Sequence, residues 1–259
     1  MGCIDMRMRA IAVSCLFLLP TASAFAACDS GLAERMHAKL HPARALDHER
    51  AVCQPWRAFP GRIIVVLPLP RPGSEPDHIE FDLDVLVVQQ ADNGNTERMT
   101  IASRVLEPRA LVHDAMRLEE IRVDTARYRL SSEARAFGLR VRYQGSSRAN
   151  PYAGETLSLY VPQGARLAKV LDRIETRLQR GEWDTNCAGN FENVNTTVSI
   201  APTQSHGFAD LTLHSTRVDS VNQAQGDECV TQDKPARLDA STLRYDGEAY
   251  RLPKSAGSN

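Results

Sequence analysis

Hydrophobic and polar residues alternate along much of the chain after residue 60, which is the pattern of half-buried β-strands. Residues 81–85 (FDLDV) alternate strictly and run into the apolar residues 86–88. Similar short segments recur between loops rich in Gly, Pro, Asn and Asp. The spacing predicts a mainly β fold with antiparallel β-sandwich or barrel-like portions. The expected strands are residues 62–67, 81–88, 98–106, 118–123, 136–143, 156–161, 196–200, 209–214 and 242–252.

Turn signals join some of these strands into hairpins. Asp246-Gly247 lies between two alternating segments and predicts a two-residue type I′ hairpin with Tyr245 and Tyr250 across the ladder. Residues 92–95 (DNGN) also favour a turn. They could supply calcium ligands, but the twelve-residue calcium loop with a distal Glu is missing, so a plain turn is the preferred interpretation.

Residues 29–54 are predicted to be helical. Over residues 29–54, apolar side chains recur at four-residue spacing up to Leu40, Pro42 ends or kinks the run, and residues 43–52 contain good helix formers. We therefore expect a loose pair of helices in this short N-terminal region.

Residues 165–180 fit two structures. Their apolar residues follow the i, i+3, i+4, i+7, i+11 stripe of an amphipathic helix, whereas Ile174, Thr176 and Leu178 also alternate as in a strand. Helix is the preferred interpretation, with strand as the alternative.

The N-terminus has the three parts of an export signal. Arg7 and Arg9 precede an apolar run at residues 11–19, and Ala24 and Ala26 match the small-x-small pattern of signal peptidase. Cleavage is expected after Ala26. The apolar run is about half the roughly 20 residues of a spanning helix, so we expect a periplasmic or secreted protein without a permanent membrane anchor.

Four cysteines remain after the signal, an even number that suits an oxidising compartment: Cys28, Cys53, Cys187 and Cys229. We favour the pairs 28–53 and 187–229, because both close local segments; the two other pairings stay open. A lipoprotein acylated at Cys28 is an alternative, but Phe25 replaces the usual Leu of that motif and three cysteines would be left over.

The charge balance limits the possible partners of the chain. With 31 Lys and Arg against 32 Asp and Glu, the net charge is −1, which gives no electrostatic basis for binding nucleic acid. The expected organisation is a signal peptide (1–26), a helical segment (27–58), a β-rich domain (59–162) and a second β-rich portion (163–259).

The densest metal-capable group is His37, His41 and His48. Histidines four residues apart on a helix share one face and could hold zinc. Pro42 interrupts the run and Glu is absent from position 38, so surface histidines without a metal are preferred. No metal or cofactor is assigned.

Asp82 and Asp84 point to the same side of their expected strand, and paired carboxylates serve glycoside hydrolysis or calcium binding. The simpler interpretation makes them the solvent face of an amphipathic strand whose opposite face is buried. The sequence also lacks a G-x-S-x-G elbow, so no catalytic residue is assigned.

Trp183, with Glu182 and Asp184 beside it and Cys187 close behind, is the best candidate for surface recognition. An aromatic ring among amides and carboxylates suits a sugar or a protein ligand. Packing in a core beside a disulfide is the alternative, and it is favoured for the ring itself.

Three segments together resemble exported Gram-negative proteins of unknown function: residues 145–152 (GSSRANPY), 181–184 (GEWD) with 187–189 (CAG), and 243–247 (LRYDG). The resemblance implies a periplasmic or secreted location and transfers no catalytic residue. The expected function is a disulfide-stabilised binding or interaction protein with an unknown protein or saccharide ligand. The alternative is a secreted hydrolase that uses Asp82, Asp84 or a histidine.

Overall fold

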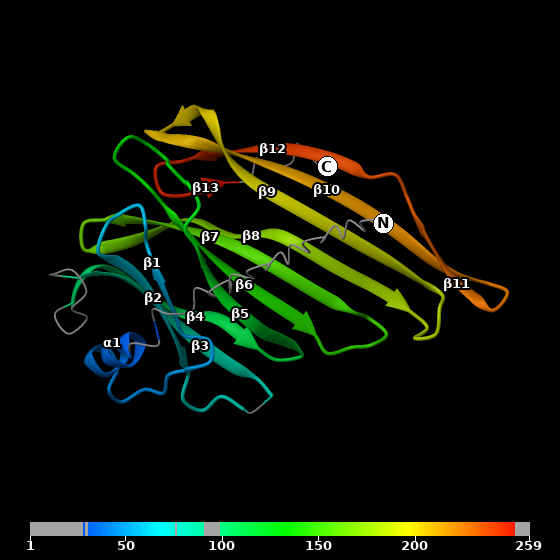
Figure 1. Ribbon diagram of the computed structural model, residues 1–259, viewed down its shortest axis with the longest axis horizontal. Helices are drawn as coiled ribbons and strands as arrows, with labels where there is room; N and C mark the ends of the chain where they lie inside the picture. The colour runs from blue at the N-terminus through cyan, green and yellow to red at the C-terminus, as the bar shows by residue number, and fades with distance from the viewer. Residues whose placement is uncertain (1–27, 29–30, 76, 91–98, 252–259) are drawn as a thin grey trace, which may run out of the picture.

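The structure is a computed structural model that describes residue 28 and residues 31–75, 77–90 and 99–251 (Figure 1). The expected signal peptide and the turn at residues 92–95 lie outside these ranges. The elements are α1 (Leu32–Leu40), β1 (Val52–Pro55), β2 (Arg62–Pro70), β3 (Ile79–Gln90), β4 (Met99–His113), β5 (Met116–Asp124), β6 (Phe137–Gly145), β7 (Tyr152–Gln163), β8 (Arg166–Trp183), β9 (Gly189–Ser205), β10 (Phe208–Gln225), β11 (Glu228–Asp233), β12 (Arg237–Tyr245) and β13 (Tyr250–Arg251). In the described ranges, no helix has the length and apolarity needed to span a membrane.

The strands form two antiparallel meanders that share one mixed sheet. β1 to β4 pair in sequence order and make the first meander; β5 to β10 pair in sequence order and make the second, in which β10 also pairs with β11 and β12. β4 runs parallel to β8 where Arg104 lies opposite Arg166, and this pairing joins the two meanders. The predicted mainly β, sandwich-like architecture is confirmed.

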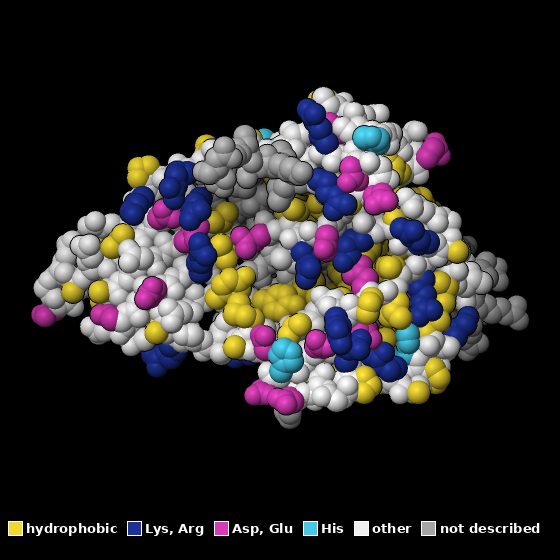
Figure 2. All heavy atoms as spheres, turned by 180° about the vertical axis from the view of Figure 1, so that it is seen from behind, with side chains coloured by type: hydrophobic (Ala, Val, Ile, Leu, Met, Phe, Trp, Pro, Cys, Tyr) yellow, Lys and Arg dark blue, Asp and Glu magenta, His cyan; other side chains and the backbone are white. Residues whose placement is uncertain are grey.

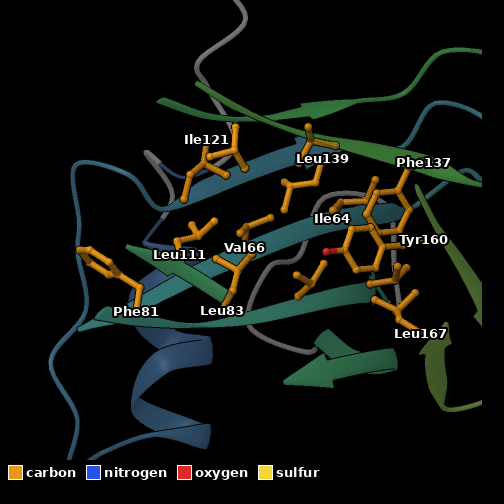
Figure 3. Close-up of a cluster of buried hydrophobic side chains, with 14 of the residues drawn as sticks. Ile64, Val66, Phe81, Leu83, Leu111, Ile121, Phe137, Leu139, Tyr160 and Leu167 are labelled. Carbon is orange, nitrogen blue, oxygen red and sulfur yellow. The ribbon is translucent and has the colours of Figure 1, made fainter. Parts of the chain in front are cut away.

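The main hydrophobic core lies between the two meanders. Figure 3 shows side chains of this core, including Phe81 and Leu83 of β3 and Ile121 and Leu139 of β5 and β6. Its aromatic centre is Phe137, whose ring is 5.3 Å from that of Trp56 in an edge arrangement and 5.6 Å from that of Tyr160 in a stack. Burial of these apolar faces is the main force that holds the two meanders together.

A second core lies on the other face of the first meander. Leu32 and Met36 of α1 are four residues apart and pack with Leu86 and Val88 of β3. The odd-numbered residues of β3 therefore face the other meander, and its even-numbered residues face the layer formed by α1 and the segment after it. β3 is buried on both sides, which places Asp82 and Asp84 inside the protein.

The expected second helix at residues 43–52 is wrong, because this segment forms turns and then enters β1. Its polar groups bond to the sheet rather than to a helical turn of their own: the Asp47 N–H donates to the Pro68 carbonyl at 3.0 Å. Cys53 consequently lies on β1, opposite Val65. The predicted disulfide between Cys28 and Cys53 is present and ties the start of the described chain to this strand.

The helix preferred for residues 165–180 is also wrong, because this segment is the strand β8. The register between β7 and β8 shifts between Glu155 and Thr156 and twice more farther along β7. A bulge adds one residue to one strand and so resets which side chains face the core. Leu167, Val170 and Leu171 are all buried although their spacing is helical. The bulges therefore give this strand an apolar spacing that resembles that of a helix.

The terminal hairpin is only partly as expected. Tyr245 lies directly opposite Tyr250, with ring centres 5.4 Å apart, as predicted. The loop between them has four residues instead of two. The Asp246 carboxylate accepts the N–H groups of Glu248 and Ala249 at 2.9 and 2.8 Å, which stabilises the wider turn.

A third core continues the second meander beyond β8. It joins Leu157 and Leu159 of β7 with Leu211 of β10 and Leu243 of β12. The expected domain boundary after residue 162 falls beside the turn between β7 and β8, and these two strands pair from Tyr152 to Gln163.

Candidate functional site

An open hollow of about 630 Å³ lies at the end of the second meander that carries the β6–β7 loop. Ser146, Ser147 and Arg148 of that loop line one part of it, and strands β5 to β10 contribute the rest. A second hollow of about 760 Å³ shares Gln144, Ala153 and Gln179 with the first. The two hollows adjoin along these residues and are together called the groove below.

The strand register arranges polar side chains in two rows along the groove. Directly opposed residues share a face of a sheet, and residues two apart on one strand share it as well. Neighbouring strands are about 4.8 Å apart, so a row over five strands is about 19 Å long. The amide row is Arg117, Gln144, Ala153, Gln179 and Asn193; the arginine row beside it is Glu120, Arg142, Glu155, Arg177 and Asn195.

Arginine is the most frequent charged residue of the groove. The two hollows are lined by seven arginines and three glutamates, although the whole chain has a net charge of −1. Five of the arginines have a carboxylate partner: Arg117 with Glu119, Arg122 and Arg140 with Glu155, Arg142 with Glu120, and Arg180 with Glu192. Within the described ranges, Arg148 and Arg177 have no carboxylate partner.

A hydrogen-bonded network fixes Glu155 at the middle of the arginine row. Arg140 donates to Glu155 at 2.7 Å and to Asp124 at 2.8 Å, and Tyr128 donates to Asp124 at 2.9 Å. Burial raises the pKa of Glu155, but hydrogen bonds from Thr176 and Arg140 lower it further than burial raises it. Burial and the neighbouring Asp124 raise the pKa of Tyr128 to about 12. Burial raises the pKa of Asp124 as well, but hydrogen bonds from the Ala126 N–H, Arg140 and Tyr128 lower it further. Both carboxyls therefore stay ionised and hold Arg140 in place at neutral pH.

Trp183 positions the loop of the groove and is only half-buried. Its indole Nε1 donates to the Arg148 carbonyl at 2.5 Å, and its backbone N–H donates to the Ala149 carbonyl at 3.0 Å. The ring lies 6.3 Å from that of Phe191, which lines the groove. Trp183 belongs to none of the three core clusters described above. Trp183 therefore contributes to the groove by holding the backbone of Arg148, which lines it.

The two acidic neighbours of Trp183 have different surroundings. The Asp184 carboxylate accepts the N–H groups of Asn186 and Cys187 at 2.9 and 2.8 Å, so it closes the turn between β8 and β9. These bonds lower the pKa of Asp184. Glu182 is exposed and lines a smaller hollow that adjoins the groove. The predicted disulfide between Cys187 and Cys229 is present and connects this turn to β11.

The interpretation of Asp82 and Asp84 as a solvent face is wrong, because Asp82 is 6% exposed and Asp84 is 0% exposed. His41 Nε2 lies 2.7 Å from Asp84 Oδ2, and Arg104 Nη2 lies 2.8 Å from the same oxygen. The sequence alternates as an amphipathic strand would, but the layer formed by α1 and the next segment covers this face. That layer supplies His41, and Arg104 comes from β4.

Asp82 is neutralised by a separate set of donors. Arg44 lies 3.1 Å and Arg71 2.8 Å from its two carboxylate oxygens, and the Arg109 N–H donates at 2.9 Å. Burial raises the pKa of Asp82, and these three donors together lower it below its ordinary value. The buried carboxylates thus attach the segment after α1 to the sheet.

The three histidines of the N-terminal segment do not converge. His37 Nε2 bonds to the Arg44 carbonyl at 2.8 Å, His48 Nδ1 bonds to Glu34 at 3.3 Å, and His41 bonds to Asp84. The expectation that all three lie at the surface is wrong for His41, whose side chain is 10% exposed. Within the described ranges, no three His, Cys, Asp or Glu side chains are grouped so that they could hold a metal ion.

Sequence reasoning missed the arginines and amides of the groove. They come from β5, β6, β8, β9 and the β6–β7 loop, and strand pairing brings them together. One signal was present: Arg140, Arg142 and Gln144 occupy every second position of β6, with the apolar Val141 and Tyr143 between them. That alternation identifies a polar sheet face, although it gives no indication of its partners on the neighbouring strands.

Charge is also mixed over the rest of the surface. Figure 2 shows one face on which basic and acidic side chains lie among each other, with hydrophobic side chains visible where the face is hollowed. Comparison of the chain with protein-family models, with curated proteins and with solved structures found no match.

Proposed function

We propose that this is an exported binding protein whose ligand lies in the groove. The observation that carries the proposal is the open groove itself, which two polar rows of side chains cross. Trp183 holds the β6–β7 loop at its edge, and the disulfide between Cys187 and Cys229 joins the β8–β9 turn to β11. A site built on paired strands has a rigid backbone and therefore needs little backbone ordering when a ligand binds.

Export is supported by the sequence signal and by two disulfides, since such bonds persist in oxidising compartments. A periplasmic or secreted location is therefore part of the proposal. Intact-mass measurement of the protein from native cells tests it: cleavage after Ala26 with four oxidised cysteines supports export, and an uncleaved protein with free thiols contradicts it.

The alternative of a hydrolase has one observation in its favour, because His41 and Asp84 do form a hydrogen-bonded pair. That pair is enclosed, however: Asp84 has no exposed surface, and Arg104 occupies the same carboxylate. A general base must reach the proton that it removes, directly or through one water. The groove is the better site because it is open to solvent.

Thermal unfolding of the oxidised protein in the presence of envelope saccharides and peptides tests binding. A ligand of the groove should raise the melting temperature of the wild-type protein. The rise should disappear in the double variant Gln179→Ala, Asn193→Ala. It should persist in Ser199→Ala, which changes an exposed residue of the same strand as Asn193 outside the groove.

Two results would contradict the proposal. One is a ligand whose effect survives the double variant unchanged, because that ligand binds elsewhere. The other is hydrolytic turnover by the purified protein that disappears in His41→Gln while the melting temperature stays the same, because that result assigns the function to the enclosed pair.

A further inference from the structure

We propose that the ligand of the groove is an acidic oligosaccharide that lies across the strands and places carboxylate or phosphate groups on Arg148 and Arg177. The inference rests on the proposed function, since it names the chemical class of the ligand for the same groove.

The positive charge available to a ligand comes from these two arginines. The other five arginines of the groove already bond to carboxylates, whereas Arg148 and Arg177 are exposed and have no such partner within the described ranges. A guanidinium presents two parallel N–H donors that match the oxygens of a carboxylate or a phosphate. Two free guanidinium groups on the β6–β7 loop and on β8 suit a ligand with more than one acid group.

The groups between these arginines suit hydroxyl-rich molecules. Gln144, Gln179 and Asn193 each offer an amide donor and an amide acceptor, and they lie on neighbouring strands except where Ala153 intervenes. The short side chain of Ala153 leaves space in the row. A sugar chain placed along the row would meet amide donors and acceptors from β6 to β9, a distance of about 14 Å.

Apolar contact in the groove is restricted to a few ring faces. Pro151, Tyr152 and Phe191 are among its lining residues, and the faces of such rings can pack against the C–H surfaces of sugars. Protein interfaces instead place large apolar anchors at their centre. Of the described residues, the exposed large hydrophobic ones are Leu106 and Leu238, and neither lines the groove. The lining therefore favours a saccharide over a protein.

The small number of free positive charges in the groove also argues against nucleic acid as the ligand. A nucleic-acid site neutralises many phosphates at once and needs a correspondingly large surplus of Lys and Arg. The groove arginines are mostly neutralised by their own carboxylates, and two free cations remain. Such a surplus fits an oligosaccharide with widely spaced acid groups.

Isothermal titration of the full oxidised protein tests the inference with three probes. The first is a tetragalacturonate, the second is the same tetramer after reduction of its carboxyl groups to alcohols, and the third is a phosphorylated mannotetraose. At least one acidic probe should bind, and should bind at least about tenfold more tightly than the neutral tetramer, because each charged hydrogen bond adds to affinity. Its affinity should fall as salt is raised. The two acidic probes distinguish carboxylate from phosphate recognition.

Variants locate the acid groups on the protein. Arg148→Gln and Arg177→Gln should each weaken the acidic probe about tenfold or more and leave the neutral tetramer unchanged. Arg57→Gln is the matched control, because Arg57 is an exposed arginine outside the groove. It should leave the affinity unchanged. Equal loss in all three variants would indicate a general charge effect and would overturn the assignment to Arg148 and Arg177.

Two further results overturn the inference and remain distinguishable from failure of the proposed function. If the neutral tetramer binds as tightly as the acidic ones and Gln179→Ala weakens it, the groove binds a ligand but does not select acid groups. If no oligosaccharide binds while a peptide raises the melting temperature through Gln179 and Asn193, the groove belongs to a protein partner. If no groove variant affects any ligand, both proposals fail.

Discussion

The indole Nε1 of Trp183 donates to the backbone carbonyl of Arg148 at 2.5 Å, and this bond spans 35 positions of the sequence. It joins the end of β8 to the β6–β7 loop. Two backbone bonds run alongside it, from Gly181 N–H to the Pro151 carbonyl and from Trp183 N–H to the Ala149 carbonyl, both at 3.0 Å. The loop that carries an uncompensated arginine is thus held by the strand that forms the floor of the groove.

Replacing Trp183 with Phe should loosen this loop. The variant keeps an aromatic ring but loses the indole donor, which costs about 1 kcal/mol of unfolding free energy. Hydrogen exchange measures the effect: the amides of Gly181 and Trp183 should exchange faster, while the amides of the β9–β10 pairing keep their protection. Unchanged exchange at residues 181 and 183 would show that the backbone bonds hold the loop without the indole.

Removing the disulfide between Cys187 and Cys229 should destabilise the β8–β9 and β10–β11 hairpins. The two cysteines are 42 positions apart, and on the chain-entropy model a loop of this length gives about 4 kcal/mol. The double variant Cys187→Ser, Cys229→Ser should lose that amount in urea unfolding. Exchange protection should fall in β11 and at the β8–β9 turn and stay high in β2 and β3.

The matched change at the other disulfide gives the contrast. Cys28 and Cys53 are 25 positions apart, for which the same model gives about 3.5 kcal/mol. Their double Ser variant should expose the layer of α1 and leave the β8–β9 turn protected. If both variants loosened the same region, the disulfides would not act locally.

Replacing Asp84 with Ala should be strongly destabilising. The change leaves Arg104 and His41 without their carboxylate in a buried site, and loss of one partner of a buried ion pair costs about 3–5 kcal/mol. Urea unfolding measures the loss. Asp239→Ala on β12 is the control, because Asp239 is exposed, and its effect should stay within about 0.5 kcal/mol. Equal small effects would mean that Asp84 is not needed to neutralise its neighbours.

Acid should unfold the protein through one buried and two half-buried carboxylates. The folded-state pKa values of Asp82, Asp124 and Glu155 lie below their ordinary values, because arginine, hydroxyl and backbone donors outweigh the opposing effect of burial. The unfolded chain then binds more protons as the pH falls below about 4. The stabilisation from these groups is fully present above their unfolded-state pKa and is lost as the pH falls through the lowered folded-state values.

Urea unfolding between pH 7 and pH 2 measures this loss. The unfolding free energy should be nearly level from pH 7 to about 5 and should then fall. Arg140→Gln removes a donor shared by Asp124 and Glu155, so the fall should become smaller in that variant. A wild-type profile that stays flat down to pH 3 would contradict the pKa directions.

The sequence predicts strands and disulfides well because their signals are local. Alternation over residues 81–88 depends on neighbours along the chain, and the spacing of Cys28 and Cys53 makes their pairing a short loop. β8 was mistaken for a helix because its bulges are set by pairing with β7, and a bulge changes the apolar spacing without any local mark.

The candidate sites were harder to predict because they depend on contacts between distant segments. Asp82 alternates as a surface residue would, and its burial follows from Arg44 and Arg71 reaching it from other segments. The groove depends on register: Arg177 and Arg142 share a row since both oppose Glu155 on β7. Trp183 was singled out from its own neighbourhood, but its bond to Arg148 could not be predicted from that neighbourhood.

The single parallel contact at Arg104 and Arg166 bears on how the chain assembles. Among the described residues, every other strand pair lies within one meander. Pairs that are near in sequence close at small entropic cost, so the first meander can complete its ladder before β8 has been synthesised. The strands of the groove begin after His113 and pair with one another. Substitutions in the first meander can therefore lower the stability of the protein while the strand register of the groove stays intact.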